Sequence, residues 1–287
     1  MQGVFDAGGL PVYLAGMALD PIALAQELLA AYETGSPLET PFSARDAGFD
    51  LNAAYAVEAE FARLRIAQGH RACGLKVGYA NKAMWRALKL DTLVWARMYD
   101  DTVHFSNNGA AELALPFYHA PKIEPEIVFK LKQPITTAGL DAAAVLGLVE
   151  WMAIGFEIIH CPFPDWKFQP VDFVAAFGLH VGLVVGEPVA IDDARIPGLV
   201  EELPRFKVKL QKNGELIEEG SGKNSLRSPA LCLAELGGAA MARGSELEAG
   251  DLVSSGTLTN GQMAQRGETW SVEVEGLPLK GLQLKFL

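Results

Sequence analysis

The stretch Lys122–Leu131, KIEPEIVFKL, places apolar residues at every second position, which predicts a β-strand. On such a strand Glu124 and Glu126 project from the same face, about 7 Å apart along the backbone. Two carboxylates this close repel each other unless a cation lies between them or one stays protonated. The alternative is that both acids belong to the water-exposed face of an amphipathic strand.

A third acid, Glu157, lies in a second apolar stretch, Trp151–Ile159, WMAIGFEII. Its neighbours are too apolar for a surface strand, so a lone carboxylate there needs a function or a salt bridge. Three carboxylates on two apolar strands point to an all-oxygen site for Mg²⁺ or Mn²⁺, because hard divalent ions prefer such ligands. The spacing alone leaves the metal site and the exposed face both open.

Length and composition narrow the class of protein. The 287 residues fit one large domain or two modest ones, and 50% of them are hydrophobic while 21% are charged. This composition supports a sizeable core and argues against disorder. The net charge of −11 argues against nucleic acid or an anionic membrane as the main partner. It leaves room for a small anionic substrate, which responds to local charge.

Cysteine usage and hydropathy predict the compartment. Cys73, Cys161 and Cys232 are far apart and form no CxxC or Cys/His pattern, so neither a disulfide framework nor a zinc site is indicated. The first 14 residues lack the positive region of a signal peptide. No apolar stretch reaches the roughly 18 residues that a membrane span needs. We therefore expect a soluble cytoplasmic protein without a membrane partner.

The order of predicted elements divides the chain near residue 110. Helices are predicted from Asp20 to Gly35 and from about Asn52 to Gln68, and the last third is mostly β, with an Asn213-Gly214 hairpin turn. Between them, Lys76 is the only charge in a short strand bracketed by Gly74 and Gly78, which permit close approach to a ligand or another strand. Asp100-Asp101 reads as a turn, although both acids could join a metal site.

Four motifs, in order, resemble the fumarylacetoacetate hydrolase superfamily and, within it, the 2-keto-4-pentenoate hydratase and 4-oxalocrotonate decarboxylase branch. They are GLKVG at 74–78, IEPEI at 123–127, FEII at 156–159 with Asp165-Trp166 after it, and AGDLVSSGTL at 249–258. The resemblance spans roughly residues 20–287. It implies an α+β fold with an N-terminal helical cap region (1–110) and a mixed β-roll catalytic domain (111–287). It also implies a homo-oligomer, which a homologous enzyme subunit could join.

The resemblance implies that Glu124, Glu126 and Glu157 hold Mg²⁺ or Mn²⁺ and that Lys76 reaches the same site; no organic cofactor is expected. We expect Lys76 to carry the proton, with a pKa that falls because the side chain is partly buried beside a cation.

The other candidate residues flank the predicted strands. Asp165 and Lys167 are the next catalytic candidates, in a loop that follows a buried strand. Ser255, Thr257 and His160 are candidates for holding the substrate, and Thr259 is a further one. Hydroxyls on a strand are also ordinary β residues, and a lone histidine beside an apolar strand is often a core residue.

The chain departs from the branch on the substrate side. After Asp165-Trp166 the branch usually has an Asp-Asn-Ala-Ser run, and this chain has Asp172-Phe173-Val174-Ala175-Ala176, which keeps the acid and loses the amide and the hydroxyl. The helix that often begins Gly-His-Pro begins here with Arg227-Ser228-Pro229. The family's metal site therefore applies to this chain more directly than the family's substrate does.

The expected function is a divalent-metal-dependent hydratase that adds water to a 2-hydroxydienoate or 2-keto-enoate in aromatic or related catabolism. A 2-keto acid chelates a cation through its carboxylate and keto oxygen, and the cation stabilises the enolate. Three alternatives remain: a 4-oxalocrotonate-type decarboxylase, an acylpyruvate C–C hydrolase, and a non-catalytic partner subunit of an active homologue. Three buried carboxylates without a cation are costly, which counts against the last of these.

Overall fold

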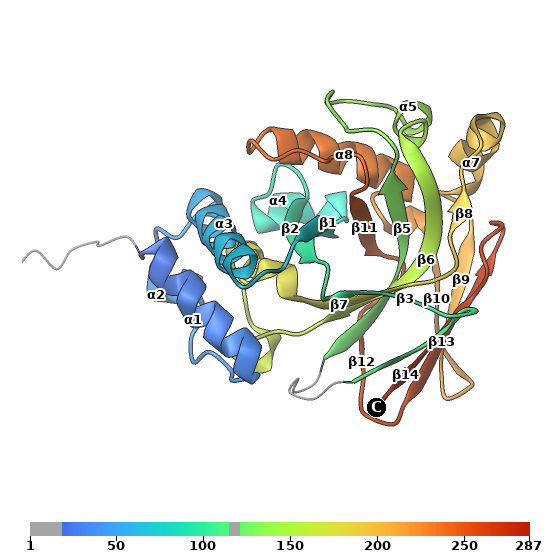
Figure 1. The fold of residues 1–287 in the computed structure, drawn as a ribbon. Helices are drawn as coiled ribbons and strands as arrows, with labels where there is room; N and C mark the ends of the chain where they lie inside the picture. The colour runs from blue at the N-terminus through green and yellow to red at the C-terminus, as the bar shows by residue number, and fades with distance from the viewer. Residues whose placement is uncertain (1–18, 115–120) are drawn as a thin grey trace, which may run out of the picture.

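The computed structural model describes residues 19–114 and 121–287, so the prediction for the first 14 residues lies outside the described part. Three helices lie together at one end of the molecule, and curved sheets form the other end (Figure 1). These helices are α1 (Pro21–Thr34), α2 (Phe42–Arg45) and α3 (Leu51–Ala67). The side chains of Asp20 and Asp50 accept hydrogen bonds from the first turns of α1 and α3, which fixes both helix starts.

The larger sheet carries the predicted acidic strands at its centre. Its strand order is β2-β1-β11-β5-β6-β7-β3, with β12 paired to β5 and β8 to β6. The pairs β1/β11 and β3/β7 are parallel, and the other pairs are antiparallel. The strands are β1 (Ala72–Gly78), β2 (Val94–Tyr99), β3 (Val103–Phe105), β5 (Lys122–Leu131), β6 (Val149–Ile159), β7 (His180–Val185), β8 (Val189–Ala190), β11 (Leu252–Thr257) and β12 (Gln262–Met263).

The smaller sheet has the order β10-β9-β13-β14-β4. Asn213 and Gly214, both with positive φ, join β9 to β10 in the predicted hairpin. Its strands are β4 (Ala110–Leu113), β9 (Lys207–Lys212), β10 (Glu215–Ser221), β13 (Thr269–Glu275) and β14 (Leu282–Phe286). The two sheets curl into a half-barrel, which confirms the predicted α+β class (Figure 1).

In the described part of the chain, five further α-helices lie around the sheets: α4 (Lys82–Leu88), α5 (Ala142–Leu146), α6 (Pro170–Ala175), α7 (Ile196–Glu202) and α8 (Pro229–Met241). Helix α8 packs on β11 and β2, so it covers the sheet beside the acidic strands. Phe129 of β5 and Phe156 of β6 are fully buried there. Among the described helices, none is long and apolar enough to cross a membrane.

The helical end is tied to the sheets by aromatic and charged contacts. The rings of Phe61 in α3 and Phe177 stack with centroids 4.6 Å apart, and Arg65 pairs with Asp101 at 2.6 Å. Asp100 and Asp101 form the turn after β2, as predicted, and their charges are matched by Arg71 and Arg65.

The sheet begins earlier in the chain than the division near residue 110. Strands β1 and β2 precede that residue, and both are hydrogen-bonded into the larger sheet. The run of helices that starts the described chain ends at Ala67. We therefore propose that the cap consists of α1–α3 and that the catalytic sheet begins with β1.

Candidate metal centre and active site

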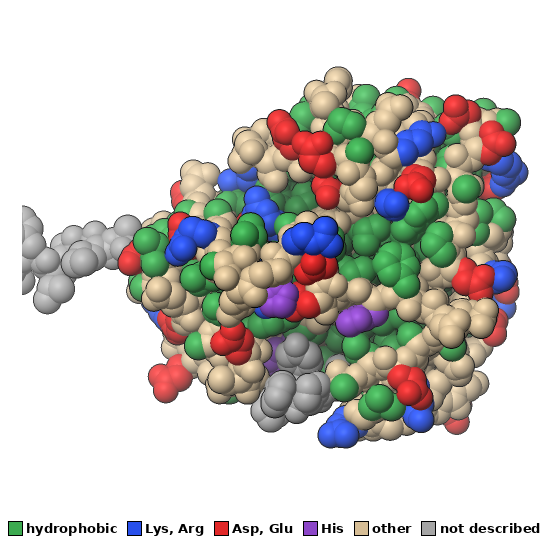
Figure 2. All heavy atoms as spheres, in the orientation of Figure 1, with side chains coloured by type: hydrophobic (Ala, Val, Ile, Leu, Met, Phe, Trp, Pro, Cys, Tyr) green, Lys and Arg blue, Asp and Glu red, His purple; other side chains and the backbone are tan. Residues whose placement is uncertain are grey.

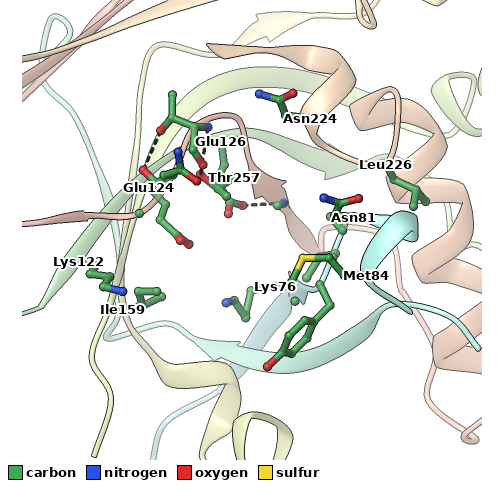
Figure 3. Close-up of a pocket in the computed structure, with 18 of the residues that line it drawn as sticks. Lys76, Asn81, Met84, Lys122, Glu124, Glu126, Ile159, Asn224, Leu226 and Thr257 are labelled. Carbon is green, nitrogen blue, oxygen red and sulfur yellow. Dashed lines mark hydrogen bonds between the residues drawn. The ribbon is translucent and has the colours of Figure 1, made fainter. Parts of the chain in front are cut away.

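The pairing of β5 with β6 brings the three predicted carboxylates together. In the antiparallel register Glu124 lies opposite Glu157, and Glu126 lies opposite Gly155. Each acid offers a carboxylate oxygen, and these oxygens lie within 4.8 Å of one another. Glu126 and Glu157 are buried, while Glu124 is half-buried at the cavity wall (Figure 3).

A β-bulge orients Glu126. Ser254 of β11 lies opposite Val128 and Thr257 lies opposite Glu126, so β11 holds one extra residue there. Gly256, at a φ of 89°, occupies the bulge. The Ser254 hydroxyl and the Gly256 N–H both donate to Glu126 Oε2, at 2.6 and 2.8 Å. One carboxylate oxygen is thereby committed to the protein, and Oε1 is left for a ligand.

Glu157 is held from two sides. Its Oε1 lies 2.9 Å from Nδ1 of His180, and its Oε2 lies 3.0 Å from the Lys76 ammonium. Glu124 accepts no hydrogen bond from the described residues. It packs closely against Gly261, where an added Cβ would lie 2.6 Å from Glu124 Oε1.

The site is a concentration of buried negative charge. Burial, together with Glu157 and Glu124, raises the pKa of Glu126 well above its usual value. Burial raises the pKa of Glu124 to about 7, although Lys76 acts in the opposite direction. Among the described ammonium groups, only that of Lys76 forms an ion pair with one of these three carboxylates. A divalent cation would relieve both the desolvation and the repulsion. The all-oxygen donor set fits Mg²⁺ or Mn²⁺.

Lys76 reaches the carboxylates from β1. The side chain is 2% exposed, donates to Gly178 O at 3.0 Å, and lies over the Phe173 ring with Nζ 4.7 Å from its centroid. Gly178 is required there, because its φ is 64° and a Cβ would lie 2.7 Å from Lys76 Cδ.

The pKa of Lys76 differs from the prediction. Burial lowers it, but Glu157, Glu124 and Glu126 together raise it above the usual value. The predicted fall in the pKa of Lys76 is therefore wrong when only the groups of the protein act on it. It depended on a neighbouring cation, whose charge would offset that of the carboxylates.

These groups lie in a cavity of about 1100 Å³ that Lys76, Glu124 and Glu126 help to line. Apolar side chains line part of the rest of it, among them Tyr79, Met84, Trp166, Phe168 and Phe173 (Figure 3 draws part of the lining). The polar part of the lining includes the cations Lys82, Lys122, Lys223 and Arg227; the amides Asn81, Asn224 and Asn260; the hydroxyl residues Thr257 and Thr259; and the acid Glu218.

The structure separates the predicted hydroxyl residues. Thr257 lines the cavity, and its hydroxyl donates to Thr259 O at 2.9 Å. Ser255 is buried outside the cavity lining. Its neighbour Ser254 is the serine that reaches the carboxylates, because successive strand residues point to opposite faces.

Asp165 and Lys167, the next catalytic candidates, do not line the cavity that holds the carboxylates. Their side chains are 75% and 81% exposed and pair with each other at 3.2 Å. Asp165 and Trp166 both have positive φ, a tight turn that directs Trp166 to the cavity and its neighbours to water. His160 also lies outside the cavity lining.

Asp172 has a structural role rather than a place in the cavity. It is fully buried and accepts hydrogen bonds from Ser43 of α2 and from Gln169 N, the latter at 2.8 Å. The next residue, Phe173, faces Lys76 instead. Phe173 stands where the resemblance expects an amide, so an aromatic ring replaces a polar group on the substrate side.

Residues 100–280 match the family model for the fumarylacetoacetate (FAA) hydrolase C-terminal domain. The chain belongs to the fumarylacetoacetate hydrolase family. This match confirms the superfamily resemblance. The predicted β-roll core is confirmed by the fold shared with a solved 4-oxalocrotonate decarboxylase.

Similar family members are lyase-type enzymes. The 2-keto-4-pentenoate hydratase of Paraburkholderia xenovorans (strain LB400) is 28% identical over 88% of this chain and 90% of its own. The 4-oxalocrotonate decarboxylase of Pseudomonas sp. (strain CF600) is 27% identical over 78% of this chain and 81% of its own. The 4-oxalocrotonate decarboxylase from Pseudomonas putida G7, solved with magnesium and adipate, superposes with a TM-score of 0.84 at 23% identity, covering 95% of this chain and 100% of that one. The predicted branch is confirmed.

Proposed function

We propose that this member of the fumarylacetoacetate hydrolase family is a divalent-metal-dependent hydratase of a 2-hydroxydienoate or 2-keto-enoate. The observation that supports it is the cluster of Glu124, Glu126 and Glu157 around the Lys76 ammonium in the wall of a large cavity. Hydratases among the similar proteins support the reaction class.

The three glutamates would hold Mg²⁺ or Mn²⁺. When bound, the ion supplies Lewis-acid stabilisation of the negative charge that develops on the keto oxygen and carboxylate of the substrate. Ser254 and Gly256 keep Glu126 in place for this.

Lys76 carries the proton in this proposal. Its Nζ is fixed by Gly178 O and Glu157, at 3.0 Å from each. In a hydratase the dienol is converted to the ketone by protonation at carbon, and water then adds to the conjugated double bond. Among the described cations that line the cavity, Lys76 is the one that pairs with a carboxylate of the cluster, so we assign the proton to its Nζ.

The carboxylate site is tested with Glu124→Gln. This variant keeps the shape of the side chain and loses the charge, so the thermal stabilisation of the protein by Mg²⁺ should disappear. Glu150→Gln is the matched control, because Glu150 lies on the same strand pair, is exposed and pairs with Lys130. An unchanged melting shift in Glu124→Gln would refute the metal site.

A decarboxylase of a dicarboxylic substrate is the second candidate, and unpaired cations favour it. Lys82, Lys122, Lys223 and Arg227 line the cavity, and none forms an ion pair within the described residues. Lys122 precedes Glu124 by two residues on the same strand face, about 7 Å away along the strand. Its ammonium lies 3.9 Å from the Trp166 ring centroid. A second carboxylate on the substrate would match these charges.

Product analysis with Mg²⁺ and matched mono- and dicarboxylic 2-keto substrates separates the candidates. A hydratase retains every carbon, a decarboxylase releases carbon dioxide, and a C–C hydrolase yields two acids. No turnover of either substrate, combined with tight binding to an active homologue, would instead establish a non-catalytic partner subunit.

We further propose that the enzyme is a cytoplasmic homo-oligomer. The three cysteines are free, which suits a reducing compartment. An apolar area lies over the curved strands on the face shown in Figure 2, and Phe105 of β3 is 56% exposed. Light scattering coupled to size-exclusion chromatography tests the oligomer, and a monomer at all concentrations would refute it.

A further inference from the structure

A buried chain of hydrogen bonds leads from Glu157 to the turn after β2. Nδ1 of His180 lies 2.9 Å from Glu157 Oε1, and its Nε2 lies 2.9 Å from the hydroxyl of Thr102. That hydroxyl in turn lies 2.9 Å from Tyr99 O. His180 and Thr102 are each 3% exposed and Glu157 is 0% exposed, so water does not compete for these bonds.

Counting the protons on the Thr102 hydroxyl and the His180 ring shows which group donates in the bond between His180 and Glu157. The Thr102 hydroxyl has one proton, which goes to Tyr99 O or to Nε2 of His180. In either case a bond between Nδ1 and the Glu157 carboxylate requires the proton on Nδ1, because a carboxylate only accepts. His180 therefore donates from Nδ1 to Glu157 Oε1 whether the ring is neutral or charged.

Thr102 fixes the ring because Thr102 itself cannot move freely. Its carbonyl accepts from Leu183 N of β7 at 2.8 Å, and its hydroxyl accepts from Tyr99 N at 3.3 Å. Three segments, the β2–β3 turn, β7 and β6, thus converge on one carboxylate. Such convergence has a cost, since two polar side chains are buried where apolar ones would pack.

We propose that His180, oriented by Thr102, is a positioning residue that holds Glu157 for the divalent cation. With Oε1 bound to His180, only Oε2 is left, and it lies at the Lys76 ammonium beside the other carboxylates. His180 thereby selects a single carboxylate rotamer and one ligand oxygen. This inference rests on the metal site of the proposed function, and it adds two residues that touch neither the cavity nor the substrate.

Four variants of the full-length, metal-stripped protein test this role, with Mn²⁺ affinity measured by calorimetry. His180→Leu removes the donor and should weaken Mn²⁺ binding about 10- to 100-fold, the usual effect of losing such an outer partner. His180→Asn places an amide N–H near the position of Nδ1 and should restore most of the affinity. Thr102→Val leaves the ring unfixed and should give a smaller loss. His104→Leu, on exposed β3, is the control and should bind as the parent does.

Recovery of Mn²⁺ affinity in His180→Asn separates positioning from general stability. Asparagine supplies the N–H donor but does not fill the space of the imidazole ring, so it would not replace a histidine that acts only by packing. Equal Mn²⁺ affinity of His180→Leu and the parent would overturn the inference while leaving the metal site intact. If His180→Leu does not fold, an unchanged affinity of Thr102→Val overturns it instead. A parent protein that binds no Mn²⁺, or binds it equally well as Glu126→Gln, would refute the proposed function itself.

Discussion

At the scale of single residues, Glu124, Glu126 and Glu157 are distinguished by their partners. Glu126 is held by Ser254 and Gly256, and Glu157 by His180 and Lys76. Glu124 has no hydrogen-bond donor among the described residues, so it is the acid most free to adjust to a ligand. Its raised pKa gives two predictions at this scale, and the position of Lys76 gives a third.

Metal affinity should depend on pH through Glu124 and Glu126. Burial disfavours both carboxylates, raising the pKa of Glu124 to about 7 and that of Glu126 well above its usual value, so protons must leave before a cation binds. We expect the apparent Mg²⁺ affinity, measured by calorimetry, to fall as the pH drops below about 7. An affinity that stays constant from pH 8 to about 5.5 would contradict this prediction.

The raised pKa of Glu124 has a consequence for stability without metal. The folded protein holds this proton more tightly than the unfolded chain, whose group has the usual value of 4.5. Stability of the metal-free protein should therefore decrease as the pH rises from about 4.5 to about 7, and added Mg²⁺ should reverse the loss.

Lys76→Met should abolish turnover and keep the metal. Removing the proton carrier is expected to lower kcat by about 10²- to 10⁴-fold. Mn²⁺ should still bind, because the substitution removes a positive charge from beside the carboxylates. Steady-state kinetics and calorimetry on the same preparation check both parts. Lys167→Met, at an exposed position, should retain activity, and turnover retained by Lys76→Met would exclude Lys76 as the proton carrier.

At the scale of elements, the bulge in β11 connects the fold to the site. The extra residue between Ser254 and Thr257 is what turns the Gly256 N–H toward Glu126. A Cβ on Gly256 would lie 2.7 Å from Cβ of Ala80, so the position admits only glycine without a shift. The strand on the other side of β11 is β1, which presents Lys76 opposite Ser254.

Gly256→Ala should lower both stability and Mn²⁺ affinity. The positive φ and the contact with Ala80 are expected to cost about 1–3 kcal/mol, measured by urea unfolding. Gly250→Ala is the matched control, since Gly250 also has a positive φ of 96° but nothing within 4 Å of an added Cβ. It should lose some stability and keep its Mn²⁺ affinity; equal losses of affinity in both variants would refute the role of the bulge.

At the scale of the whole molecule, the cap is fixed to the sheets through Asp172. Its carboxylate accepts hydrogen bonds from both the backbone N–H and the hydroxyl of Ser43 in α2. It also caps the start of α6, beside the cavity. Asp172, the acid that this chain keeps from the family's Asp-Asn-Ala-Ser run, thus acts in the attachment of the cap.

Asp172→Asn should reduce stability without changing substrate binding. The amide cannot accept all three hydrogen bonds, so the free energy of unfolding should fall by about 1–3 kcal/mol. KM should remain that of the parent, because Asp172 does not line the cavity. Asp165→Asn, at an exposed site, is the control. A raised KM with unchanged stability would contradict this prediction and indicate a contact between Asp172 and the substrate.

Local patterns in the sequence determined several features of this protein. The period of two along Lys122–Leu131 placed Glu124 and Glu126 on one face, because side-chain direction on a strand depends only on the backbone. Asp20 marked a helix start and Asn213-Gly214 marked a hairpin. Both depend only on neighbouring residues, since a cap bonds the first turn of its own helix and the turn needs residues that adopt a positive φ. The ordered motifs then pointed to the family.

Tertiary structure alone decided which groups meet those carboxylates. Ser254 joins Glu126 across 128 residues, and Thr102 joins His180 across 78. Strand register and bulge position arise from packing between distant segments, so no local rule chooses Ser254 over Ser255. The turn at Asp165-Trp166 likewise sent the aromatic ring inward and the charges outward. The pattern of Lys122–Leu131 predicted where a cation binds. Pairing between distant strands decided that Ser254 and His180 hold the carboxylates that would bind it.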